Sequence, residues 1–301
     1  MLGAPASPPE RPSALLPLNA SVSGIAPVFC VHGGFGTVFD YAPLARRVEG
    51  RRQLIGVQCR TLINPSFADP SLTAMAAGYA DEIMEAQDSG PYHLIGWSLG
   101  GLIACLVAAE LERRGKEVAS LGLIDSFVPD PQRRAERRAE KYWTDELLGL
   151  LSVAAPGAQI ATIRSQAAAL RDAGAPETDE AIRHLIASAI ATTHRQARDR
   201  LLGVDDIVAA FRVGRHLKRL AYEADWPAAL FAEPACWWTS GRLEQRDVLG
   251  ARLTAAVDLG VLGDDHFAIL ANDAFLSSIW SWLEPVGAAQ PVQAPQSEPA
   301  E

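Results

Sequence analysis

The chain has 301 residues, of which 49% are hydrophobic and 21% charged, the composition of an ordinary globular protein. Its formal net charge of -9 argues against binding of nucleic acid, and no apolar run is long enough to cross a bilayer. The four cysteines lie far apart in apolar stretches, which predicts reduced core thiols and neither disulfides nor a metal site. The amino terminus does not resemble a signal peptide, so we expect a cytoplasmic protein.

Most of the chain alternates between short apolar runs and helical patterns, which is typical of an α/β domain with a mostly parallel sheet. Residues 1–17 are rich in proline and lack periodicity, which predicts a flexible linker, and residues 285–301 predict a disordered tail. The expected strands are Val28–Val31, Leu54–Val57, Tyr92–Gly96, Val118–Ile124, Ala235–Thr239 and Ala255–Leu259. Helical patterns between the strands include residues 39–48, 70–88 and 99–115.

Residues 126–230 interrupt this alternation, because they contain no convincing strand and several helical patterns. An all-helical insertion between two strands predicts a lid, whose amphipathic helices would cover the site and shape its pocket. The alternative is two ordinary crossover helices joined by a long loop. We therefore expect an α/β core formed by residues 18–125 and 231–284, with the helical lid inserted before the last two strands.

The sequence GWSLGG at residues 96–101 joins an apolar strand to a helix, with Ser98 in its centre. A G-x-S-x-G pattern in this context is typical of the nucleophile elbow of an α/β-hydrolase fold. Gly96 and Gly100 allow a sharp turn that lifts Ser98 Oγ above the sheet, at the positive end of the following helix. The alternative is a glycine-rich turn with an incidental serine.

A second glycine-rich loop, HGGFG at residues 32–36, follows the first strong strand. In this fold such a loop supplies one N–H group of the oxyanion hole, and the residue after the nucleophile supplies the other. We expect the backbone of Leu99 as one donor and that of Gly34 or Phe35 as the second. A phosphate- or dinucleotide-binding loop would require further residues that are absent here. His32 beside the loop is expected to have a structural role.

A serine nucleophile needs a base, and in this fold the order along the chain is serine, acid, histidine. His266 follows the last expected strand in the sequence GDDHF and precedes a closing helix, where the base belongs. Three other histidines follow Ser98 within the expected lid and are predicted to be surface residues: His184, His194 and His216.

Asp125 is the favoured acid, because it ends the strand that precedes the lid and would face the active edge of the sheet. Glu244 and Asp247, after the next strand, are the alternative. Asp264 and Asp265 flank the base too closely to orient it well, so a loop-capping role is expected for them.

These segments resemble the terminal (type I) thioesterase domain of nonribosomal peptide synthetases. The resemblance rests on GPYHLIGWSLGG at residues 90–101, LGLIDS at residues 121–126, PVFCVHGG at residues 27–34 and GDDHF at residues 263–267. It covers residues 16–126 and 230–283, whereas the lid is similar only in its position and helical character. The family's acid stands where Asp125 does. The corresponding loop of the family often reads His-Pro-small-Gly-Gly, whereas residues 32–36 read HGGFG here. This difference leaves the identity of the second oxyanion donor open.

The resemblance implies a function in chain release. A peptidyl or depsipeptidyl chain would arrive as a thioester on the phosphopantetheine of an upstream peptidyl carrier domain and transfer to Ser98 as an ester. Water, or an amine or hydroxyl of the chain itself, would then release it, with a slight preference for macrocyclisation because the lid is long. No cofactor or metal is expected to be bound by the chain itself. The alternatives are a stand-alone editing (type II) thioesterase, a carboxylesterase acting on free small esters, and a catalytically silent binding module.

Overall fold

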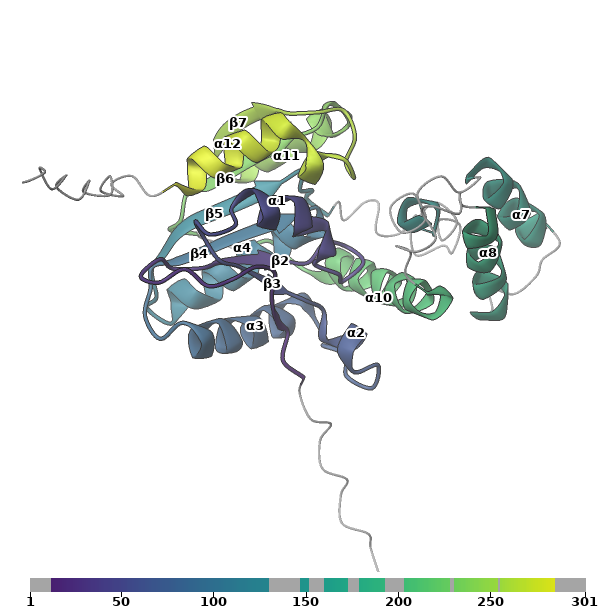
Figure 1. The fold of residues 1–301 in the computed structure, drawn as a ribbon, viewed down its shortest axis with the longest axis horizontal. Helices are drawn as coiled ribbons and strands as arrows, with labels where there is room; N and C mark the ends of the chain where they lie inside the picture. The colour runs from purple at the N-terminus through teal and green to yellow at the C-terminus, as the bar shows by residue number, and fades with distance from the viewer. Residues whose placement is uncertain are drawn as a thin grey trace, which may run out of the picture.

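The structure is a computed structural model that describes residues 12–129, 147–151, 160–172, 179–192, 203–227, 230–253 and 255–284. Its centre is a seven-stranded sheet with the strand order β1-β3-β2-β4-β5-β6-β7 (Figure 1). The strands are β1 (Leu15–Pro17), β2 (Val28–Val31), β3 (Leu54–Val57), β4 (Tyr92–Trp97), β5 (Val118–Ile124), β6 (Pro234–Trp238) and β7 (Val257–Val261). Only β1 runs antiparallel to its neighbour among these described strands, so the expected mostly parallel sheet is confirmed.

Helices cover both faces of the sheet. The helices of the described residues include α1 (Ala42–Arg47), α2 (Arg60–Ile63), α3 (Leu72–Ala86), α4 (Leu99–Arg113), α7 (Ile160–Asp172), α8 (Asp179–Thr192), α10 (Val204–Glu223), α11 (Leu243–Arg252) and α12 (Asp273–Leu283), with short 3-10 turns at 39–41, 240–242 and 269–271. Successive strand residues point to opposite faces. Val31 and Leu94 therefore pack in the apolar cluster with α3 and α4, whereas Cys30 and Ile95 pack with α1 and α12.

The strand expectations need correction at four strands. Leu15–Pro17, the end of the segment predicted to be a flexible linker, forms the edge strand β1 against β3. Three residues are too few to show a period of two, so the composition of the preceding segment concealed the strand. β4 extends to Trp97, and β6 spans Pro234–Trp238, one residue earlier than expected. β7 begins at Val257, because α11 and its C-cap at Leu253 occupy the chain up to that point.

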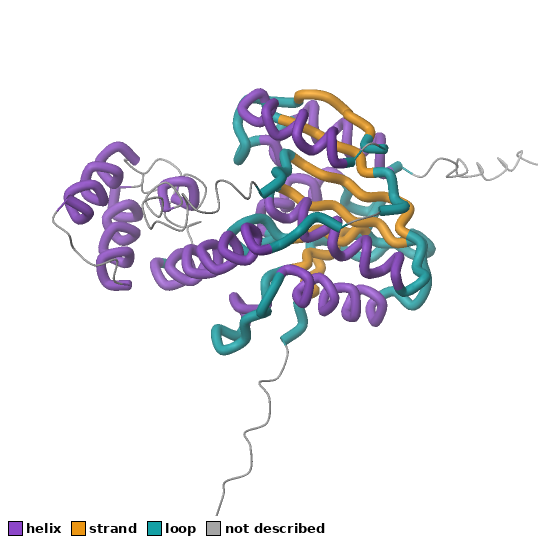
Figure 2. The backbone as a smooth tube through the Cα atoms, turned by 180° about the vertical axis from the view of Figure 1, so that it is seen from behind, coloured by secondary structure: helices purple, strands orange, loops and turns teal. Residues whose placement is uncertain are grey.

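Most of the described residues of the expected lid are helical, and no strand lies among the described ones. Residues 147–151, α7, α8 and the first half of α10 share an apolar cluster of their own. The second half of α10, through Val213, Leu217 and Leu220, packs in the cluster under the sheet. Figures 1 and 2 both show α10 reaching from the sheet toward α7 and α8. This one helix of the expected lid thus also packs in the α/β core, which the sequence did not predict.

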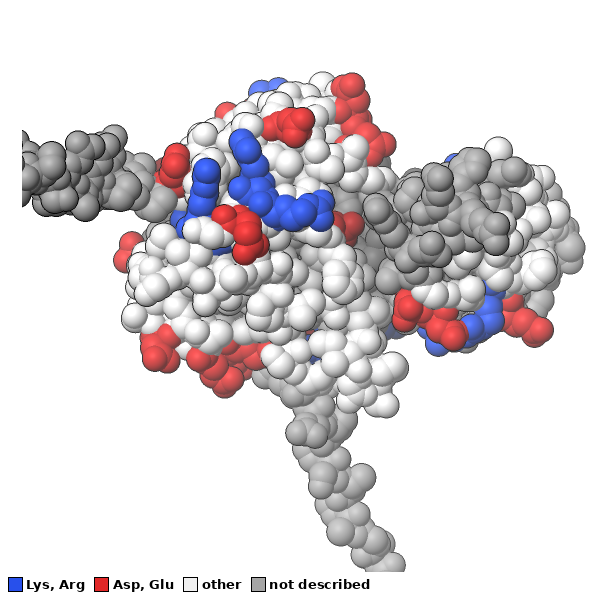
Figure 3. Space-filling view, in the orientation of Figure 1, with Lys and Arg blue, Asp and Glu red and all other residues white. Residues whose placement is uncertain are grey.

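The described surface carries mixed charge. Figure 3 shows separate acidic groups on one face and a smaller basic group over the region of α1. Arg46, Arg47 and Arg51, at the end of α1 and just after it, are exposed. Of the helices that the structure describes, none combines the length and apolar character needed to cross a membrane. The predicted tail at 285–301 lies outside the described residues.

Candidate active site

Ser98 stands at the turn between β4 and α4, in a backbone conformation with φ 58° and ψ -122°. Such strain costs roughly 1–3 kcal/mol in a residue that is not glycine, and it is concentrated at functional sites. A Cβ atom on Gly96 would lie 2.1 Å from the carbonyl oxygen of Gly100, and one on Gly100 would lie 2.6 Å from that of His32. Both positions therefore require glycine, as the sharp turn predicted from the sequence demands.

Ser98, His266 and Asp125 form one hydrogen-bonded chain. His266 Nε2 lies 2.9 Å from Ser98 Oγ, and its Nδ1 lies 2.5 Å from Asp125 Oδ2. An ionised carboxylate only accepts hydrogen bonds, so the neutral imidazole carries its proton on Nδ1 and the serine hydroxyl donates to Nε2. This is the proton arrangement in which a histidine can take the proton of a serine nucleophile.

Asp125 is fully buried where β5 ends, and its backbone N–H donates to the carbonyl of Trp237 over 2.7 Å. The backbone N–H of Thr239 donates to Oδ1 over 2.8 Å, and the Thr239 hydroxyl lies 3.0 Å from each carboxylate oxygen. Burial alone raises the pKa of Asp125, but the hydrogen bonds from His266 and Thr239 outweigh it and hold the pKa below its ordinary value. The acid therefore stays ionised at neutral pH.

His266 is held from two sides. Its ring stacks on Trp97 with a centroid distance of 4.9 Å and an interplanar angle of 27°, and the indole Nε1–H of Trp97 donates to the His266 carbonyl over 3.1 Å. Burial lowers the pKa of His266; Asp125 opposes this shift, whereas the nearby cation of Arg242 adds to it. The net pKa lies below the ordinary value of 6.5, so the imidazole is neutral and able to accept a proton at neutral pH.

The other candidates lie elsewhere. Glu244 and Asp247 are exposed on α11 and are not within hydrogen-bonding distance of His266. The Asp265 carboxylate accepts the N–H groups of residues 267 and 268, and Asp264 accepts from the Ser240 hydroxyl, which fits the expected loop-capping role.

The remaining histidines also have other surroundings. His184 is exposed on α8, and His216 on α10 contacts the carbonyl of Asp69 over 3.3 Å. His194 lies outside the described residues. His32 is buried, with its ring nitrogens at 2.8 Å from the Gly33 carbonyl and 2.9 Å from the Tyr79 hydroxyl, contacts of the structural kind that was expected.

A cavity of about 240 Å³ opens in front of Ser98 and His266. All three expected oxyanion residues line it: Leu99, Gly34 and Phe35. Leu99 is the first residue of α4, and the N–H groups of a helix's first turn have no partner within the helix. Gly149, Gly214, Lys218 and Tyr222 also line the cavity, so the helical insertion contributes to the pocket.

The structure adds site residues that the sequence did not reveal. Thr239 and Trp97 hold the acid and the base, and Arg242 places its Nε 3.9 Å from Asp125 Oδ2. Thr239 follows β6 directly, and β6 pairs with β5, which ends at the acid. If the pairing of β5 with β6 had been known, Thr239 could have been predicted to lie beside Asp125. The position of Trp97 next to Ser98 in the sequence was the one indication that its ring would contact His266.

Comparisons with known proteins agree with this geometry. A family model described as a thioesterase domain matches residues 26–283. The chain is 38% identical over 114 residues to malpibaldin synthetase of Mortierella alpina, which is 38% of this chain and 2% of that protein. It is 34% identical over 112 residues to enterobactin synthase component F of Escherichia coli (strain K12), which is 37% of this chain and 9% of that protein. The chain thus spans only a small part of the length of these relatives.

Solved structures share the fold. A four-domain nonribosomal peptide synthetase, holo-AB3403 bound to AMP and glycine, matches with a TM-score of 0.72 and 20% identity over 92% of this chain and 20% of that one. The NocB thioesterase domain in covalent complex with a fluorophosphonate nocardicin G analog matches with a TM-score of 0.59 and 19% identity, over 90% of this chain and 100% of that one. The resemblance noted in the sequence to synthetase thioesterase domains is therefore confirmed.

Proposed function

Because the chain belongs to the thioesterase domain family, we propose that it releases a peptidyl or depsipeptidyl chain from a phosphopantetheine carrier domain through an ester on Ser98. The carrier would be an upstream peptidyl carrier domain of the same synthetase, since the matched relatives are synthetases of which this chain spans a small part. Release would occur by macrocyclisation or by hydrolysis. The chain itself would need no bound cofactor, because the pantetheine belongs to the carrier.

The observation that carries this proposal is the hydrogen-bonded chain from Ser98 through His266 to Asp125 at the wall of a cavity. In the first step, Ser98 Oγ attacks the thioester carbonyl while His266 Nε2 takes the hydroxyl proton. The same proton then passes to the departing pantetheine sulfur, and an ester on Ser98 remains. The negative charge that develops on the carbonyl oxygen is stabilised by the N–H of Leu99 and by one from the loop 33–36.

In the second step, a new nucleophile enters the cavity and loses its proton to His266 Nε2. Water gives the free acid, whereas an amine or hydroxyl of the bound chain gives a macrocycle. Ser98 Oγ regains the proton as the ester bond breaks. The aromatic side chains of Phe35, Phe127 and Phe267 at the cavity support a site from which a folded acyl chain excludes water.

The test uses peptidyl thioesters of N-acetylcysteamine of increasing length, with intact-protein and product mass spectrometry. We expect an acyl adduct on Ser98, its loss in Ser98→Ala, and products that identify hydrolysis or cyclisation. A matched oxygen ester and an acetyl thioester serve as controls. A large preference for the oxygen ester would favour a carboxylesterase, and a preference for the acetyl thioester would favour an editing thioesterase. Failure of a fluorophosphonate to label Ser98 would favour a silent binding module.

A further inference from the structure

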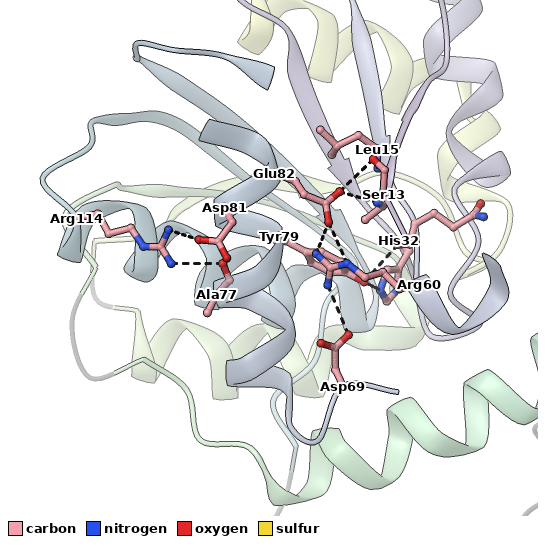
Figure 4. Close-up of polar contacts among 12 residues, drawn as sticks. Ser13, Leu15, His32, Arg60, Asp69, Ala77, Tyr79, Asp81, Glu82 and Arg114 are labelled. Carbon is pink, nitrogen blue, oxygen red and sulfur yellow. Dashed lines mark hydrogen bonds and ion pairs between the residues drawn. The ribbon is translucent and has the colours of Figure 1, made fainter. Parts of the chain in front are cut away.

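A buried polar network connects α2 and α3 with His32, the first residue of the glycine-rich loop (Figure 4). Arg60 is fully buried on α2, and its Nε and Nη2 donate to Glu82 Oε1 over 3.0 and 2.6 Å. The guanidinium also lies over the ring of Tyr79, 4.6 Å from its centroid. Glu82 uses its other oxygen, Oε2, to accept the backbone N–H of Ala14 over 2.6 Å. The catalytic steps proposed above use none of these side chains.

The network reaches the loop through His32. A backbone carbonyl only accepts hydrogen bonds, so the contact of 2.8 Å between His32 Nδ1 and the Gly33 oxygen requires a proton on Nδ1. Burial lowers the pKa of His32 to about 4, so the ring is neutral at neutral pH and its Nε2 carries a lone pair. The Tyr79 hydroxyl therefore donates to Nε2 over 2.9 Å, a shorter contact than the 3.4 Å that separates it from the Gln58 carbonyl oxygen. The direction of each hydrogen bond from Tyr79 to Gly33 is thus fixed.

The Gly33 carbonyl belongs to the same peptide unit as the N–H of Gly34. In a trans peptide these two groups point in opposite directions. The carbonyl is held by His32 Nδ1–H and also by the N–H of Gly36 over 3.1 Å. The N–H of Gly34 consequently points away from the network, and Gly34 lines the cavity that contains Ser98 and Leu99.

We infer that Tyr79 and His32 are positioning residues that hold the peptide between Gly33 and Gly34, so that the Gly34 N–H serves as the second oxyanion donor. Arg60 packs over the ring of Tyr79 and pairs with Glu82, which in turn accepts the backbone N–H of Ala14. The ion pair therefore holds Tyr79 in place and connects it to the segment before β1. The inference rests on the proposed acyl transfer for its effect on rate. The orientation of the peptide can be tested independently of turnover.

The test compares Tyr79→Phe with Tyr92→Phe. Each removes one hydroxyl from a buried tyrosine, but the Tyr92 hydroxyl donates to the Gln87 carbonyl over 2.9 Å, and Tyr92 begins β4 at the opposite end from Ser98. Tyr79→Phe leaves the lone pair of His32 Nε2 buried without a donor, so the imidazole loses the contact that orients its Nδ1–H toward the Gly33 carbonyl, which is then held firmly only by the Gly36 N–H. We expect kcat to fall about tenfold with KM unchanged, less than the 10²–10³-fold loss on removing an oxyanion donor itself. Tyr92→Phe should keep the wild-type kcat.

An NMR measurement and a second pair of variants make the result decisive. In protein labelled with [15N]glycine, the Gly34 amide resonance should shift in Tyr79→Phe and not in Tyr92→Phe, whether or not thioesters turn over. His32→Asn retains an N–H donor near the position of Nδ1 and should keep more of kcat than His32→Leu, which has none. An unchanged Gly34 resonance, or equal kcat in the two tyrosine variants, would overturn the inference. A shifted resonance in a protein that hydrolyses no thioester would instead leave the positioning intact and refute the proposed function.

Discussion

At the scale of single residues, the sequence favoured Asp125 as the acid but kept Glu244 and Asp247 as alternatives. Asp125→Asn places an amide against His266 Nδ1, and an amide NH2 group cannot accept the imidazole proton. The imidazole is then favoured in the wrong tautomer. We expect kcat to fall on the order of 10⁴-fold while the protein stays folded, measured by thioester turnover together with circular dichroism.

Glu244→Gln and Asp247→Asn provide matched controls for this prediction. Both carboxylates are exposed on α11, and both should keep near-wild-type kcat. If kcat fell in Glu244→Gln or Asp247→Asn while Asp125→Asn stayed active, the acid would be the residue that follows β6 and not Asp125. Thr239 donates hydrogen bonds from its backbone N–H and its hydroxyl to the Asp125 carboxylate, and these contacts favour Asp125 as the acid.

The pH dependence of activity follows from His266. Burial lowers its pKa below 6.5, Asp125 opposes the shift and Arg242 adds to it. Only the neutral imidazole accepts the serine proton, so kcat/KM should rise with pH through this pKa, with a midpoint below 6.5. In Arg242→Gln the cation is lost, and the acid limb should move to higher pH. A wild-type midpoint above 6.5, or a downward move in the variant, would contradict this account.

At the scale of elements, the contact between α10 and the glycine-rich loop depends on one glycine. A Cβ on Gly214 would lie 2.8 Å from Phe35 Cδ1 and 3.2 Å from the Gly34 carbonyl oxygen. Gly214→Ala should therefore displace the loop that supplies the oxyanion donor. We expect about a tenfold fall in kcat, determined from the single-turnover rate of Ser98 acylation.

Gly250→Ala is the control for a helical glycine. A Cβ there meets nothing within 4 Å, and Gly250 is exposed on α11. Since alanine is favoured over glycine in helices, this variant should gain up to about 1 kcal/mol in unfolding free energy at unchanged kcat. Equal acylation rates in the two variants would show that the loop tolerates the added methyl group.

Sequence periodicity predicted β2, β3 and β5 with their observed bounds, because buried parallel strands read as short continuous apolar runs between helices. Part of the candidate site could also be predicted from the sequence, because the residues around Ser98 are typical of a sharp turn and His266 follows the last expected strand. Thr239 and the network of Arg60, Tyr79 and His32 were not, because their contacts join segments that meet only in the folded sheet. β1 was concealed for another reason: three residues cannot establish a pattern.

At the scale of the whole molecule, α10 contributes side chains to two apolar clusters, and Leu62 of α2 packs against both. Phe211 packs among the lid helices, whereas Leu217 packs under the sheet. Phe35 of the oxyanion loop packs against the lid cluster, and Gly214 lies against the same loop. The helical insertion and the glycine-rich loop are therefore in direct contact, so a change in the packing of the insertion can alter the pocket.

The two clusters predict separable unfolding. Phe211 is 1% exposed in the lid cluster, and truncation of a buried phenylalanine to alanine costs about 3–5 kcal/mol. Because the buried members of that cluster come from the helical insertion, with Phe35 and Leu62 of the core packed against them, the loss should appear as local opening. In Phe211→Ala we expect faster amide hydrogen exchange in α7 and α8, with unchanged protection in β4 and β5.

Phe275→Ala removes an equally buried ring from the cluster of α12, so it should lower the unfolding temperature of the α/β core without selective exchange in α7 and α8. Matching exchange patterns in the two variants would mean that the lid and the core unfold as one cooperative unit.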